Sequence, residues 1–238
     1  MPILNKIITT ALPFIPKAIV GQIAKKYIAG VHLSDGVAAV EKFNKKGMKA
    51  TMDLLGEDVK NADETDLIKK EIISILHYIK ANNLNSNVSV KPTQLGLKID
   101  KELGYRNLKE IIEEADRLGN FVRIDMEDAT TTDDTLAMYR RVTSEGFRNT
   151  GVVIQAYMHR SADDVRLLVK NRVNIRLCKG IYNESPAIAY KDKQQIRDNY
   201  LTLLKLIIES GSFAAIATHD EYLLKNAYEI INIVKCLL

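Results

Sequence analysis

The sequence predicts an α/β domain of the (β/α)8 barrel type, and three observations lead to this expectation. Short apolar runs alternate with amphipathic stretches along most of the 238 residues, which is typical of a parallel sheet with helices packed on it. Polar residues close each apolar run, as expected where the carboxyl ends of all strands surround one active site. The first run lacks the GxGxxG turn that a doubly wound nucleotide-binding domain usually carries, so the barrel is favoured over the doubly wound sheet.

The order of the elements follows from this alternation. Amphipathic stretches separate the apolar runs, and several of them close with Gly or Asn, as helices commonly do. No Pro/Gly-rich linker interrupts the pattern, so we expect one barrel domain over residues 48–238, preceded by a helical segment over residues 1–47. The predicted strands lie in 49–58, 87–96, 121–129, 151–160, 174–183 and 213–221, and the predicted helices in 66–83, 107–120, 135–146, 161–172 and 194–211.

The first 30 residues hold the whole net charge of +4, because they contain four lysines and no acidic residue. Apolar residues at helical spacing predict two amphipathic helices there, separated at Pro13 and Pro16. Two interpretations stay open: the helices cover one end of the main domain, or they form a peripheral contact with an anionic membrane. Because no array of aromatic and basic residues accompanies the lysines, we expect no nucleic-acid partner.

The rest of the composition indicates a cytoplasmic protein. The two cysteines, Cys178 and Cys236, lie far apart without CxxC spacing or a histidine cluster, so we expect reduced thiols, no disulfide and no metal site. No stretch is apolar for the roughly 20 residues that a membrane span needs, and the N-terminus lacks the pattern of a cleaved signal peptide.

The polar residues at the strand ends allow several kinds of chemistry. A lysine on a barrel strand, Lys91 or Lys179, could form a Schiff base in an aldolase. The pair Asp125 and Glu127 could serve glycoside hydrolysis, or could equally be an ion-pair partner and a helix cap. Taken together, the cations, amides, hydroxyls and carboxylates would suit a large polar cofactor that bears phosphate. The full set is Asp53, Lys91, Asp125, Glu127, Gln155, Arg176, Lys179, Thr218 and His219.

Six motifs in this order, MDLLGE, VSVKPTQLG, RIDMED, VVIQAYMHRS, IRLCKGIYNE and ATHD, resemble the strand signatures of the proline dehydrogenase family over about residues 35–230. The resemblance implies a distorted (β/α)8 barrel with FAD lying across its C-terminal face. It also implies that a hydride passes from C5 of L-proline to the flavin, giving Δ1-pyrroline-5-carboxylate. Electrons would then reach a membrane quinone, which suits a protein on the inner face of the membrane.

The resemblance assigns a role to each motif. Arg176 and Gln155 would hydrogen-bond the flavin ring, where a fixed guanidinium or amide can stabilise the negative charge of the reduced cofactor. Asp125 would fix its partners beneath the ring. Lys91 would face the substrate carboxylate or the flavin edge, and Asp53 would orient Lys91.

The fifth motif would hold the ribityl and pyrophosphate portion of the cofactor. Lys179 would neutralise phosphate, and Gly180 would let backbone N–H groups approach it together with those of Ile181 and Tyr182. Thr218 and His219 would contact the same cofactor from the sixth strand.

One departure from the family pattern follows the sixth strand. The resemblance implies two further strands and a helix whose paired arginines and glutamate clamp the substrate, but no RRxxE run occurs, and YRRVTSEG at 139–146 lies in an earlier predicted helix. We therefore expect about six of eight βα units, a barrel incomplete at the C-terminus, and little proline oxidation by this chain alone. The competing hypotheses are a working FAD-dependent dehydrogenase, a non-catalytic or degenerate fragment, and a Schiff-base aldolase.

Overall fold

A computed structural model describes residues 28–30, 32–56 and 59–237 of the protein. The two helices predicted near the N-terminus, and with them the membrane contact, fall on residues 1–27, outside the described part. Within the described residues, no helix combines the length and the apolar character needed to cross a bilayer.

The described residues divide into two compact units: those up to residue 50 together with 84–86, and the described residues of 51–83 together with 87–237. In the first unit, helix α3 spans Leu33–Asn44. The side-chain amide of Asn44 donates to the carbonyl oxygens of Met48 at 2.9 Å and Asn85 at 3.1 Å, and its oxygen accepts from the Asn85 N–H at 2.8 Å. These three bonds tie the end of α3 to the short segment 84–86 of the same unit.

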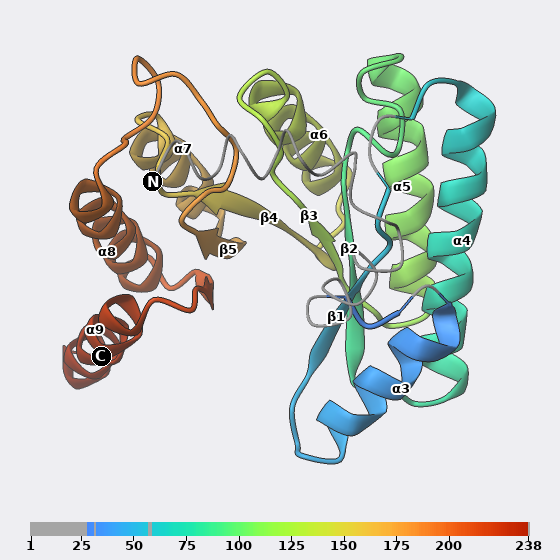
Figure 1. Ribbon diagram of the computed structural model, residues 1–238, viewed down its shortest axis with the longest axis horizontal. Helices are drawn as coiled ribbons and strands as arrows, with labels where there is room; N and C mark the ends of the chain where they lie inside the picture. The colour runs from blue at the N-terminus through green and yellow to red at the C-terminus, as the bar shows by residue number, and fades with distance from the viewer. Residues whose placement is uncertain (1–27, 31, 57–58, 238) are drawn as a thin grey trace, which may run out of the picture. The chain divides into compact units, whose positions relative to one another are not determined.

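A six-stranded sheet runs in the order β1 to β6, so each strand lies beside its neighbour in the chain (Figure 1). The four pairings from β2 to β6 are all parallel. Strands that follow one another in this way, each connected to the next through a helix, form the wall of a (β/α) barrel. The predicted α/β barrel-type fold is therefore confirmed, with strands β1 Ala50–Asp53, β2 Ser86–Val90, β3 Val122–Ile124, β4 Thr150–Gln155, β5 Asn174–Cys178 and β6 Phe213–Ala217.

Helices connect the strands as the sequence predicts, but α4, α5 and α6 begin four, six and three residues earlier than expected. Helix α5 begins at Lys101 rather than near residue 107, because the Asp100 carboxylate caps it by accepting the Leu103 N–H at 2.7 Å. Gly104 lies within this helix, where a Cβ would lie 2.9 Å from the Leu97 nitrogen, so the close approach of the preceding loop favours glycine. The other helices of the described part are α4 Ala62–Ala81, α6 Thr132–Ser144, α7 Ser161–Leu168, the 3₁₀ helix η2 Val169–Asn171, α8 Lys193–Glu209 and α9 Glu221–Leu237.

The core forms where apolar strand residues face the helices. On β5, Ile175 and Leu177 are fully buried, and the Tyr200 hydroxyl of α8 donates to the Leu177 carbonyl at 2.9 Å. Because successive side chains of a strand point to opposite faces, Arg176 between them lies on the other face of the sheet. One strand thus supplies both the core and a polar surface.

Candidate functional site

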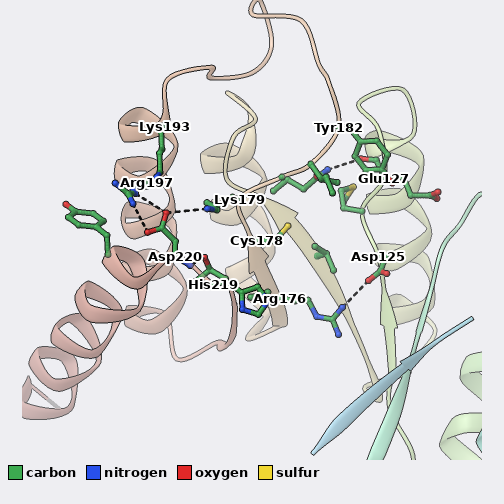
Figure 2. A pocket seen from close by; sticks show the side chains of 18 of the residues that line it. Asp125, Glu127, Arg176, Cys178, Lys179, Tyr182, Lys193, Arg197, His219 and Asp220 are labelled. Carbon is green, nitrogen blue, oxygen red and sulfur yellow. Dashed lines mark hydrogen bonds and ion pairs between the residues drawn. The ribbon is translucent and has the colours of Figure 1, made fainter. Parts of the chain in front are cut away.

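A pocket of about 1060 Å³ opens at the carboxyl ends of the strands (Figure 2). Its volume is in the range of small-molecule and cofactor sites. Of the residues singled out in the sequence, only Asp53 is not part of its lining. The structure brings together around it Lys91, Asp125, Gln155, Arg176, Lys179, Gly180, Ile181, Tyr182, Thr218 and His219.

Lys91 lies between two carboxylates. Its Nζ is 2.5 Å from Oδ2 of Asp53 and 3.7 Å from Oδ2 of Asp125, and its side chain is only 12% exposed. Burial acts to lower the pKa of Lys91, but the hydrogen bond and charge of Asp53 and the charge of Asp125 outweigh it, so the pKa is raised. Lys91 is therefore an ammonium ion at neutral pH. A Schiff-base lysine needs the opposite shift, which disfavours an aldolase that uses Lys91.

Arg176 and Asp125 form an ion pair that crosses the sheet from β5 to the end of β3 (Figure 2). Arg176 Nη1 lies 3.2 Å from Oδ1 of Asp125, and the same oxygen accepts the Ser89 hydroxyl at 2.6 Å. Since Oδ2 of Asp125 faces Lys91, this one carboxylate orients a lysine, a serine and an arginine.

Glu127 is engaged separately from Asp125. Its carboxylate accepts the N–H of Thr93 at 2.9 Å and the Thr93 hydroxyl at 2.5 Å, and its backbone carbonyl accepts the Gln155 amide at 2.8 Å. Glu127 is only 5% exposed. A buried carboxylate that holds a loop in this way is a structural group, which disfavours the glycoside-hydrolysis interpretation of the pair.

The turn after β5 depends on Gly180. Its φ of +108° is strained for other residues, and a Cβ at this position would lie 2.1 Å from the Tyr157 ring. The Tyr157 hydroxyl is buried and has no hydrogen-bond partner among the described residues, and burial raises its pKa to about 12. A close backbone approach and an adjacent lysine are features that suit a phosphate-bearing cofactor. In the same turn the Ile181 side chain is 89% exposed.

The sixth strand contributes residues of unequal exposure. The Thr218 hydroxyl accepts the Asp220 N–H at 3.1 Å and so shapes the turn, whereas the His219 side chain is exposed at the pocket. Both predicted residues therefore reach the pocket lining.

Sequence reasoning missed an ionic cluster on the side of the pocket formed by α8. Asp220 accepts two hydrogen bonds from Arg197, at 2.9 and 2.7 Å, and lies 3.3 Å from Nζ of Lys179 (Figure 2). Lys193 lies one turn before Arg197 on α8 and also lines the pocket. Basic residues four apart open the helix after the fifth strand and Asp220 directly follows His219, but the sequence does not indicate that these two segments pair.

The curated proteins most useful for comparison are all named proline dehydrogenases. The chain is 37% identical over 198 residues to Proline dehydrogenase 1 of Bacillus subtilis strain 168, covering 83% of this chain and 65% of that protein. It is 31% identical over 213 residues to Proline dehydrogenase of Deinococcus radiodurans, covering 88% of this chain and 69% of that protein. The chain thus spans about two thirds of the length of these relatives.

Among solved structures, proline utilization A from Bdellovibrio bacteriovorus superposes with a TM-score of 0.85 at 22% identity, covering 92% of this chain and 28% of that one. This likeness supports the fold. The family model described as Proline dehydrogenase matches residues 37–235, which is most of the chain. The resemblance carried by the six motifs is confirmed: the chain belongs to the proline dehydrogenase family.

Proposed function

We propose that this protein is an FAD-dependent proline dehydrogenase, which oxidises L-proline to Δ1-pyrroline-5-carboxylate and passes the electrons to a quinone. Membership of the family implies a flavin. The observation that carries the proposal is the gathering of the predicted cofactor residues, which lie on or directly after four different strands, around a single pocket. That pocket is large and cationic enough for a dinucleotide.

The residues that would hold the cofactor divide by chemistry. Lys179 and the backbone at Gly180 would bind the pyrophosphate, because a cation and backbone N–H groups suit phosphate. Arg176 and Gln155 would face the flavin ring, with Asp125 fixing the guanidinium so that it need not reorganise as negative charge builds up. When bound, the flavin supplies the acceptor for the hydride from C5 of proline.

Lys91 would complete the substrate side. Its ammonium, held by Asp53 at 2.5 Å, offers a fixed positive charge for the carboxylate of proline or for the flavin edge. Because Asp53 and Asp125 keep Lys91 protonated and aimed, the lysine would bind and orient rather than exchange protons.

The basic segment 1–30 would bring the protein to the bilayer where a quinone resides. The competing role for this segment is to cover one end of the domain. Flotation with anionic lipid vesicles distinguishes this role from membrane contact.

Anaerobic titration tests the function. After reconstitution with FAD, we expect a yellow protein whose flavin absorbance is bleached by L-proline. A Lys91→Met chain should keep the flavin and be bleached about 100-fold more slowly. The matched control is Lys98→Met, since Lys98 is an exposed lysine paired with Asp128 at 2.9 Å. A colourless protein would refute the cofactor assignment. Flavin that dithionite reduces and proline does not would favour the non-catalytic alternative.

A further inference from the structure

Asp220 is a nearly buried carboxylate that two cations share. Its side chain is 4% exposed, and Arg197 binds both of its oxygens at 2.7 and 2.9 Å. Lys179 is held less closely, with its Nζ 3.3 Å from Oδ2. The guanidinium of Arg197 also lies 4.8 Å from the centre of the Tyr222 ring, so it is fixed on two sides. In Figure 2, Asp220 lies between Lys179 and Arg197.

A carboxylate at this place raises a problem for an anionic ligand. Left unpaired, Asp220 would bind the ammonium of Lys179 fully and would repel any phosphate brought near it. The fork of Arg197 matches a carboxylate in geometry and occupies both oxygens. The hydrogen bonds from Arg197, and then those from Lys179, hold the pKa of Asp220 well below its usual range, so the carboxylate is charged.

We propose that Arg197 is a positioning residue for cofactor binding: by saturating Asp220, it releases Lys179 to pair with a phosphate group of the dinucleotide. This inference rests on the proposed function. Arg197 acts through Asp220 and not by touching the cofactor, because the two nitrogens that form its fork are already bound to the carboxylate. The substitutions at the two positions should therefore not be additive.

A double-mutant cycle on the full chain tests this coupling. We expect Arg197→Gln to weaken FAD binding about tenfold, since the uncompensated carboxylate then competes for Lys179. Adding Asp220→Asn should restore the affinity to within about threefold of the unsubstituted chain. Riboflavin, which has no phosphate, should bind all variants alike. The control is Arg166→Gln, because Arg166 pairs with Asp163 at 2.8 Å on an exposed surface.

Quenching of flavin fluorescence gives the affinities, and circular dichroism checks folding. Unchanged FAD affinity in Arg197→Gln would overturn the inference, as would a double variant no better than the single one, because Arg197 would then act directly. An equal loss for FAD and riboflavin would also overturn it, because the effect would then be structural. Asp220→Asn alone should bind FAD no more weakly than the unsubstituted chain, and a tenfold loss contradicts the role given to Arg197. If the unsubstituted chain binds riboflavin but not FAD, this inference and the proposed function both fail.

Discussion

Gly180 shows how a missing side chain shapes the pocket. We expect Gly180→Ala to lower both stability and FAD affinity, since the new Cβ would strain a backbone at φ +108° and collide with the Tyr157 ring. The control is Gly146→Ala, because Gly146 has nearly the same φ, +104°, and no atom within 4 Å of the added Cβ. Strain alone should cost about 1 kcal/mol. The collision should add about 1–3 kcal/mol more, measured as the difference between the two variants in urea unfolding.

If the two glycine variants lose the same stability, the contact with Tyr157 is not what requires glycine. If Gly180→Ala is less stable but binds FAD normally, the turn does not form part of the cofactor site.

Cys178 lies at the end of β5 and lines the pocket without acting as a reactive thiol. Burial raises its pKa to about 11, and its Sγ contacts the Ile154 carbonyl oxygen at 3.6 Å. Because only the thiolate alkylates, we expect iodoacetamide to modify Cys178 slowly at pH 8 and much faster once urea unfolds the chain. Mass spectrometry of the Cys178 peptide measures both rates. Equal rates in the folded and unfolded protein would refute the assigned environment.

Most residues of the candidate site could be predicted because they directly close a strand. Position after an apolar run suffices to place Lys91, Asp125 and Gln155 at one end of a parallel sheet. Arg197 could not be found in this way, because it comes from the helix after β5 and its partner Asp220 lies 23 residues further along the chain. Pairing between distant segments is visible only once the fold has brought them together.

At the scale of elements, α8 links stability to the pocket. The Asp192 carboxylate caps this helix by accepting the N–H groups of Gln194 and Gln195, both at 2.9 Å. We expect Asp192→Ala to cost about 1 kcal/mol of unfolding free energy and to weaken FAD binding, because Lys193 and Arg197 lie in the first turns of α8. Urea unfolding and flavin titration measure the two effects.

The matched control is Asn61→Ala. The Asn61 side chain caps α4 by accepting the Glu64 N–H at 2.9 Å, and α4 contributes no residue to the pocket. This variant should lose similar stability with unchanged FAD affinity. A parallel fall in affinity in both variants would mean that the affinity merely follows global stability.

Element boundaries were predicted less well than element types. The helix predicted in 107–120 begins six residues earlier in the structure, at Lys101. The close approach of the Leu97 backbone, which favours glycine at position 104, involves the preceding loop and cannot be deduced from helical periodicity.

For the whole molecule, ion pairs determine how the stability of the fold changes as the pH falls. Basic partners hold several carboxyl groups below their usual pKa, chiefly through hydrogen bonds: Asp66 with Lys70, Glu114 with Arg117, Asp133 with Arg160, Glu145 with Lys109 and Asp220 with Arg197. A carboxyl whose folded pKa is depressed contributes stability above its unfolded pKa and loses it as the pH falls toward the folded value.

The melting temperature should therefore be steady from pH 7 to about pH 5 and should fall below about pH 4. Asp53 opposes this trend, because burial raises its pKa, but it is one group against several. Calorimetry in low-salt buffers measures the profile, and Asp220→Asn should make the decline shallower. A melting temperature that rises as the pH falls from 5 to 3 would contradict the ion pairs described.

The overall α/β class is the most predictable property. Six apolar runs alternate with amphipathic segments, so the wrong assignment of one segment would not change the predicted class. The same repetition explains what could not be predicted. Periodicity identifies strands such as β5 and their neighbours, but it does not reveal which long side chains meet across them, such as Arg176 with Asp125.

The order of the sheet has a consequence for biosynthesis. Since every strand pairs with the one before it in the chain, each new helix-and-strand unit leaving the ribosome finds its partner strand already made. Assembly can then proceed from β1 toward β6 while translation continues.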